Sequence, residues 1–224
     1  MDPKKLARLT GIFYLIIIVC GIFSEGFVRM SLFVPGDAAQ TTANIQGAET
    51  LFRFGLASDL FMVLADVVVA VLFFYLLRPV SEKVAMLAAF FRLGQAAIIG
   101  LNLLNYISPL LLLGSASKSA WSPEQLQDLV LFFMESHRNG YLISQVFFSF
   151  NCAVMGYLLV KSPWFPKVLG YGVGLASVAY FVDAMASFLV PSLSQSLSFI
   201  MIVPVVAEIS LCGWLLIKGV KSSS

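Results

Sequence analysis

The sequence predicts an all-α, polytopic membrane protein, a bundle of six transmembrane helices with both termini in the cytoplasm. Two observations predict this fold class. Of the 224 residues, 59% are hydrophobic and 12% are charged, whereas soluble domains are about 45–50% apolar and about 25% charged. The apolar residues also form runs of helix length without an amphipathic or alternating pattern. Such runs favour spanning helices and exclude a membrane barrel.

Six apolar runs are long enough to cross a bilayer at about 20 residues per crossing. They cover residues 6–28, 54–77, 84–113, 139–160, 168–190 and 197–217. Lys4, Lys5 and Arg8 precede the apolar run from Ile12 to Phe23, as in a signal peptide, but no small-residue cleavage site comes after that run, so we expect an uncleaved first helix. The links are too short to hold a soluble domain, and we expect one integral membrane domain over residues 1–224.

Basic residues predict the orientation. The two tails and two short links carry Lys4, Lys5, Arg8, Arg78, Lys83, Lys161, Lys167, Lys218 and Lys221. The opposite side carries fewer bases, Arg29, Arg53, Lys118 and Arg138, and more acids. The positive-inside rule therefore places both termini in the cytoplasm, in agreement with an even number of spans.

Two outer segments are longer than simple turns. Pro35-Gly36-Asp37 is a turn signal, and Asp37 is a candidate helix N-cap. Ser122 at N-cap, Pro123 at N1 and Gln125 at N3 match a capping box. This capping box predicts that an amphipathic helix begins near 123 and runs to about 138. The helix either lies at the outer surface or extends the fourth span outward.

Polar side chains inside the predicted spans form two layers. Depths follow from the cytoplasmic bases at about 1.5 Å per residue. Asp66, Arg92, Gln95, Asn151 and Glu208 fall at roughly 14–18 Å, and Glu25, Asp59, Asn102 and Asp183 at roughly 24–29 Å. Intramembrane ionisable groups are costly and usually face the bundle interior or a wet cavity. These nine residues are the candidates for ligand binding or ion pairing.

Arg92 is the only base that these spans place deep in the membrane. Its guanidinium does not deprotonate, so it needs a carboxylate, and Glu208 and Asp66 are the two candidates. One interpretation is a buried ion pair that fixes helix register. The other is a binding site in which Arg92 holds an anionic group and the surplus carboxylate carries protons.

Other features exclude several chemistries or have ordinary explanations. His137 is the single histidine, so His₂ and His₃ zinc sites are excluded within one chain, and we expect it at the outer rim. We expect no metal and no cofactor, and with a net charge of +2 and no basic-aromatic patch, no nucleic-acid partner. The three cysteines fall in apolar runs, as buried hydrophobes do. Gly170 and Gly174 form a small-xxx-small pair that serves intramolecular packing or, alternatively, a homo-oligomer seam.

Several blocks resemble a bacterial membrane-protein family catalogued as domain of unknown function 4386. The more specific are Phe165-Pro166-Lys167-Val168-Leu169-Gly170 and the ending from Glu208 to Trp214-Leu215-Leu216-Ile217-Lys218-Gly219. Weaker blocks include Arg8-Leu9-Thr10-Gly11 and Phe91-Arg92-Leu93. The resemblance covers nearly the whole chain. It implies a six-helix bundle in a bacterial cytoplasmic membrane and supplies no activity.

Three functions fit these observations. The first is the binding or transport of a small or amphiphilic ligand at the polar layer, with the lipid bilayer as surroundings. Pro204, one turn before Glu208, resembles the interrupted helices of transporters. The second is a membrane enzyme on a lipid or isoprenoid, with Glu208 or Asp66 as acid/base and Arg92 as clamp. The third is a scaffold or regulator of another membrane protein. We favour the first, and the sequence leans against an enzyme.

Overall fold

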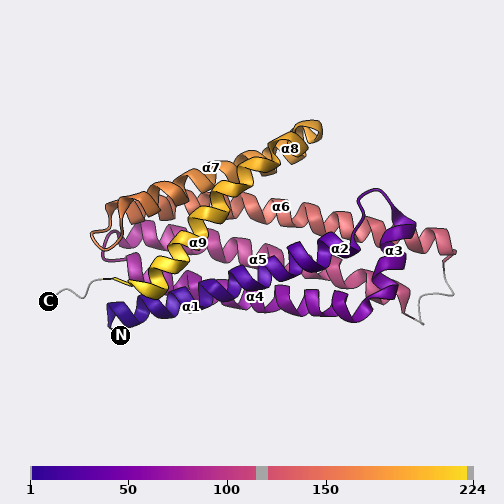
Figure 1. Ribbon diagram of the computed structural model, residues 1–224, viewed down its shortest axis with the longest axis horizontal. Helices are drawn as coiled ribbons and strands as arrows, with labels where there is room; N and C mark the ends of the chain where they lie inside the picture. Colours follow the sequence, from indigo (N-terminus) through magenta and orange to yellow (C-terminus); the bar gives the residue numbers. More distant parts are fainter. Residues whose placement is uncertain (1, 115–120, 221–224) are drawn as a thin grey trace. The chain divides into compact units, whose positions relative to one another are not determined.

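The computed structural model describes residues 2–114 and 121–220, so Lys118 and Lys221 lie outside the described residues. All regular structure in these residues is helical (Figure 1). The elements are α1 (Pro3–Gly21), η1 (Ile22–Arg29), α2 (Met30–Leu32), α3 (Ala38–Gly47), α4 (Glu49–Leu77), α5 (Glu82–Leu113), α6 (Pro123–Lys161), α7 (Lys167–Leu189), α8 (Pro191–Leu197), η2 (Ser198–Met201) and α9 (Ile202–Ile217). The predicted all-α class is confirmed.

Within residues 2–114 and 121–220, six helical segments are long and apolar enough to cross a membrane. They are Pro3–Leu32, Glu49–Leu77, Glu82–Leu113, Pro123–Lys161, Lys167–Leu189 and Phe199–Ile217. Each contains most or all of one predicted span. The protein is therefore a multi-pass membrane protein with six spanning helices.

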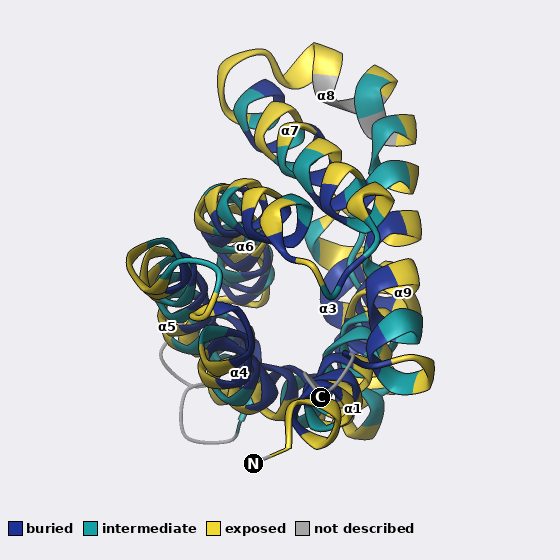
Figure 2. Ribbon diagram, turned by 90° about the vertical axis from the view of Figure 1, so that its left-hand side faces the viewer, coloured by how far each residue is buried: buried dark blue, intermediate teal, exposed yellow. Residues whose placement is uncertain are grey.

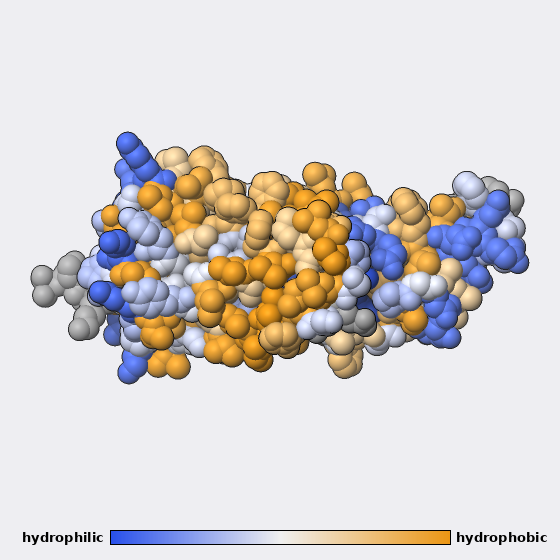
Figure 3. Space-filling view, turned by 90° about the horizontal axis from the view of Figure 1, so that it is seen from above, coloured by the Kyte–Doolittle hydropathy of each residue, from blue (hydrophilic) through white to orange (hydrophobic). Residues whose placement is uncertain are grey.

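Apolar side chains on the helix exteriors agree with this conclusion. Figure 2 shows that α7 and α9 carry both buried and exposed residues along their length. Many exposed residues are large and apolar, such as Phe199 (71% exposed) and Leu101 (70%). Figure 3 shows broad apolar areas on the visible face. Soluble monomers rarely expose such large apolar areas, whereas lipid-facing helices require them.

The first four spanning helices are longer than their predicted spans, and the extensions of the first and the fourth concern predicted segments outside the spans. The first continues from α1 through the π-helical η1 and α2 to Leu32, four residues beyond its predicted end. The fourth begins at Pro123 instead of residue 139. The amphipathic segment 123–138 is thus the start of α6, so the second of its two predicted arrangements is confirmed.

Both predicted N-caps are confirmed. The Asp37 carboxylate accepts a hydrogen bond from the Gln40 amide at 2.9 Å, at the start of α3. Gly36 before it has φ +78°, a conformation that favours glycine. Before α6, the Ser122 amide donates to Gln125 Oε1 at 2.9 Å, and the Gln125 amide donates to Ser122 Oγ at 3.3 Å. This reciprocal pair is a capping box.

The helices group into two compact units. The first comprises Met1–Ile16, Leu64–Ala97 and Leu142–Ser224, and the second comprises Ile17–Val63 and Ile98–Tyr141. Helices α1, α4, α5 and α6 each contribute residues to both units. The single domain over 1–224 stays a prediction, and each unit is described by itself below.

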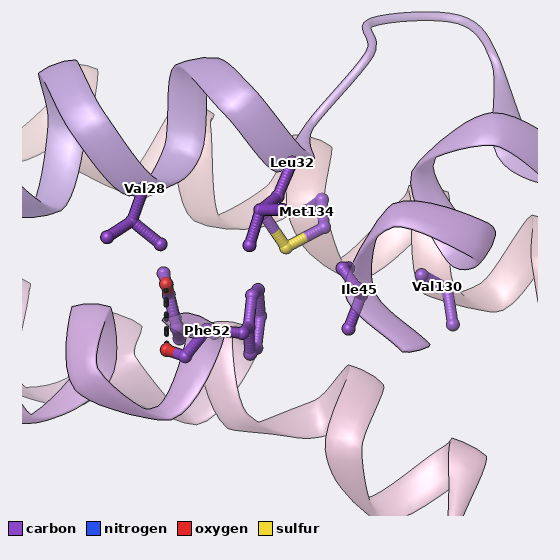
Figure 4. Packing of buried hydrophobic residues seen from close by; sticks show 7 residues of the cluster. Val28, Leu32, Ile45, Phe52, Val130 and Met134 are labelled. Atoms are coloured by element: carbon purple, nitrogen blue, oxygen red, sulfur yellow. Dashed lines mark hydrogen bonds between the residues drawn. The ribbon is translucent and has the colours of Figure 1, made fainter. Parts of the chain in front are cut away.

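A cluster of buried apolar residues forms the core of the second unit (Figure 4). Val28, Leu32, Ile45, Phe52, Tyr106, Val130 and Met134 belong to it. The rings of Phe52 and Tyr106 stack with centroids 4.3 Å apart, and the Tyr106 hydroxyl donates to the Phe52 carbonyl at 3.2 Å. This hydrogen bond satisfies a polar group within an otherwise apolar core.

In the first unit, glycines bring α6 and α7 into close contact. A Cβ added at Gly156 of α6 would lie 2.8 Å from both the Gly170 carbonyl oxygen and the Gly174 amide nitrogen of α7. Only glycine allows the two backbones this approach. Gly170 therefore serves intramolecular packing, as the first interpretation of the glycine pair expected. Homo-oligomer formation through Gly170 and Gly174 stays a prediction.

Candidate functional site

The first unit contains a buried ion pair between α4 and α5. Arg92 Nη2 lies 2.6 Å from Asp66 Oδ1, and the side chains are only 3% and 2% exposed. Gln95, three residues after Arg92 and therefore on the same face of α5, donates from Nε2 to Asp66 Oδ2 at 3.3 Å. We call these three residues, together with Glu208, the Arg92 site. The surroundings of Glu208 are described below.

Two aromatic rings cover the guanidinium. The Arg92 Cζ atom lies 5.4 Å from the ring centroid of Tyr14 in α1 and 5.3 Å from that of Phe148 in α6. A delocalised guanidinium is attracted to aromatic faces, more strongly where water is excluded. The rings therefore stabilise a cation that cannot lose its charge in this setting.

Glu208 of α9 is held by a tyrosine instead of by a cation. The Tyr180 hydroxyl of α7 donates a hydrogen bond to Glu208 Oε1. Among the described residues, no ion pair involves Glu208. Tyr14, whose ring lies over the Arg92 guanidinium, also interacts electrostatically with Glu208.

Two buried polar atoms of the Arg92 site have no partner. Arg92 Nε and Gln95 Oε1 are inaccessible to solvent, and neither makes a hydrogen bond within the described part of the chain. Buried polar groups are nearly always hydrogen-bonded, and leaving one unpaired costs about 1–3 kcal/mol. The site therefore offers one donor and one acceptor to a further group.

A second polar cluster lies in the second unit. Arg29 Nη1 donates to Asp59, which also accepts from the Ser24 hydroxyl. Arg29 is 6% exposed and Asp59 is fully buried. Arg29 Nε also lies 2.7 Å from Glu25, whose side chain is 62% exposed. The π-helical η1 holds Ser24, Glu25 and Arg29, and π-helical turns often occur at functional sites.

Aromatic rings and His137 complete this second cluster. The Arg29 Cζ atom lies 5.7 Å from the Tyr106 ring centroid and 5.1 Å from that of Tyr141. His137 packs edge-to-face on the same two rings and is 1% exposed. Its Nδ1 atom lies 3.2 Å from the Asn102 carbonyl, which can only accept, so Nδ1 carries the proton. His137 Nε2 then accepts, and it has no partner within the described residues.

The comparisons with known proteins identify the family. The model of the family described as Domain of unknown function (DUF4386) matches residues 9–219. The chain belongs to this family.

One relative and the solved structures add context to the DUF4386 assignment. An "Uncharacterized protein" of Archaeoglobus fulgidus is 28% identical over 170 residues, which cover 76% of this chain and 86% of the relative. No solved structure matches the chain. The bacterial cytoplasmic membrane stays an expectation.

The structure brings some predicted site residues of this DUF4386 protein together and separates others. Asp66, not Glu208, is the ion-pair partner of Arg92. Asn151 donates to the Ala88 carbonyl at 2.8 Å and so ties α6 to α5. Asp183 accepts from Gln145 at 2.8 Å. In the second unit, Asp59 and Glu25 meet at Arg29, whereas Asn102 donates to the His137 carbonyl at 2.7 Å.

Sequence reasoning missed the burial of Arg29 and of His137. Arg29 was counted with an outer segment, but the helical segment Pro3–Leu32 includes it and its side chain is 6% exposed. The signal was the stretch Met30-Ser31-Leu32-Phe33 after it. His137 is 1% exposed and lies 14 residues after the start of α6. Burial within the protein gives no depth in the membrane, so Arg92 as the only deep base and His137 at the outer rim stay predictions.

Proposed function

We propose that this membrane protein binds, and transports, a small or amphiphilic ligand whose polar group is held between helices at the Arg92 site. The observation that supports this function is the pair of buried, unpartnered atoms, Arg92 Nε and Gln95 Oε1. A scaffold selected only for helix pairing would satisfy both atoms with its own groups, because each unpaired atom lowers stability.

The charges indicate the ligand's chemistry. Asp66 and Glu208 are two carboxylates beside the single cation Arg92. Because Arg92 is already paired with Asp66, an anionic head group would find no free cation among the residues of this site. A neutral group that both accepts and donates a hydrogen bond, such as a hydroxyl, matches Arg92 Nε–H and Gln95 Oε1 together.

The available space bears on how such a ligand enters. Beside Arg92, a cavity of about 10 Å³ is lined by Asn151, by alanines of α4 and α5 and by larger apolar residues of α4 and α6, and it holds about one water. Gln95 does not line this cavity, so a hydroxyl group that meets both Arg92 Nε and Gln95 Oε1 requires the side chains to rearrange. A bulkier ligand requires the helices to move, as transporters do between their states.

Mass spectrometry of gently solubilised protein tests the proposal. We expect the wild type to carry a discrete hydroxyl-bearing molecule that Gln95→Leu and the charge-balanced Arg92→Gln/Asp66→Asn variant both lose. Arg53→Gln is the matched control, because Arg53 belongs to an exposed pair with Glu49, and it should keep the molecule. Flux of that molecule in proteoliposomes then separates transport from binding.

The scaffold alternative predicts the opposite pattern. All four proteins would then carry only bulk lipid. That result would overturn the binding proposal.

A further inference from the structure

A groove of about 480 Å³ opens in the first unit beside the last turns of α4. Its wall includes Leu6 of α1, Val71, Leu72, Tyr75 and Leu76 of α4, and Trp164 between α6 and α7. Volumes of about 300–1,000 Å³ are typical of small-molecule sites. This groove is separate from the Arg92 site, and none of the residues of that site lines it.

The groove offers an apolar wall to an alkyl chain. Residues 71, 72, 75 and 76 form two pairs one turn apart on α4 and cover about 7.5 Å of its axis. Leu72 and Leu76 are buried, at 8% and 3% exposure, while Val71 and Tyr75 are about half exposed. Part of an alkyl chain lying there would contact these apolar side chains.

One basic side chain lines the groove. Arg78 places its guanidinium 4.8 Å from the Tyr75 ring centroid. Lys4 and Lys5 directly precede Leu6, and Lys161 and Lys167 lie three residues before and after Trp164 in the sequence, but these lysines do not line the groove. A ligand with one apolar chain and one anionic head group complements this arrangement.

We propose that this groove binds an acyl chain of an anionic phospholipid, with the lipid phosphate against Arg78. The aromatic residues Tyr75 and Trp164 then lie at the level of the head groups, where tyrosine and tryptophan are favoured. The proposal does not depend on the Arg92 site.

Lipid titration of delipidated full-length protein, followed by native mass spectrometry, tests this site. Dioleoyl phosphatidylglycerol should bind about tenfold more tightly than zwitterionic dioleoyl phosphatidylcholine, because charge-assisted hydrogen bonds contribute that much. Arg78→Gln should remove the preference for phosphatidylglycerol. Val71→Trp should fill the groove and reduce the binding of both lipids.

Two control variants separate this site from general lipid binding. Lys218→Gln removes an exposed base that does not line the groove, and Val205→Trp adds the same ring to an exposed position of α9. Both should retain the wild-type preference. Equal binding of the two lipids to the wild type, or the same effect from variants and controls, would overturn the proposal.

Discussion

An arginine buried between helices keeps its charge, so it needs an anion within hydrogen-bonding distance. Arg29 and Arg92 each have one, Asp59 and Asp66, and each guanidinium also lies near two aromatic rings. The same physical requirement is therefore met in the same way in each unit. The difference is the extra carboxylate: Glu25 is exposed and pairs with Arg29, whereas Glu208 is partly buried and accepts a hydrogen bond from the Tyr180 hydroxyl.

The buried ion pair of Arg29 with Asp59 predicts that replacing Arg29 strongly lowers the free energy of unfolding. Arg29→Gln leaves the fully buried Asp59 without a cation, and breaking a buried pair costs about 3–5 kcal/mol. Adding Asp59→Asn should recover part of this loss, with a coupling of about 0.5–3 kcal/mol. Denaturant titration of the detergent-solubilised protein measures both values.

The exposed pair of Arg53 and Glu49 provides the control for this prediction. Its side chains are 59% and 53% exposed, and such pairs contribute about 0–1 kcal/mol. Arg53→Gln should therefore change the free energy of unfolding little. If Arg29→Gln costs no more than Arg53→Gln, the Arg29 pair does not stabilise the second unit as argued.

At the scale of residues, the sequence predicts that a buried charge needs a partner of opposite charge, but it does not predict which residue is that partner. The cost of an unpaired charge was enough to expect a carboxylate beside Arg92. Asp66 and Glu208 have the same expected depth, so depth could not separate them. The choice depends on which faces of α4, α5 and α9 meet, and no local pattern contains that information. Arg29 was missed for a different reason, because a charge near a predicted helix end looks the same whether the helix stops or continues.

At the scale of elements, helix starts were easier to predict than helix continuity. The caps at Asp37 and Ser122 depend on residues within four positions, which the sequence displays directly. The junction between the amphipathic segment 123–138 and the fourth span has no such marker. A surface helix and a helical extension show the same periodicity, so the sequence left both open.

The contact of α6 with α7 gives an element-scale prediction. In Gly156→Ala the added Cβ would meet backbone atoms of Gly170 and Gly174 at 2.8 Å. Backbone cannot move aside as a side chain does, so the helices must separate, at a cost of about 1–3 kcal/mol. Thermal unfolding followed by tryptophan fluorescence should show a lowered midpoint.

Gly213→Ala is the matched control for this contact. A Cβ at Gly213 of α9 would meet nothing within 4 Å, and replacing glycine by alanine within a helix stabilises by roughly 0.5–1 kcal/mol. Its midpoint should stay unchanged or rise. Equal loss in the two variants would show that glycine flexibility, and not the close approach, matters at Gly156.

At the scale of the whole molecule, six spanning segments require both termini to lie on one side of the membrane. The bases of the tails and of the links after α4 and α6 predict that this side is the cytoplasm. The capped helix α3 and the start of α6 then lie on the outer side. This orientation also determines which leaflet supplies lipid to the groove at Arg78.

Cysteine labelling in intact cells tests the orientation. In a background with Cys20, Cys152 and Cys212 replaced by alanine, Gln46→Cys reports the side of α3 and Glu82→Cys reports the start of α5; both positions are exposed. A membrane-impermeant maleimide should label Gln46→Cys in intact cells and Glu82→Cys only after permeabilisation. Neither substitution removes a base, so the positive-inside signal is unchanged. The reverse pattern would mean that the termini face outward and that the groove draws its lipid from the outer leaflet.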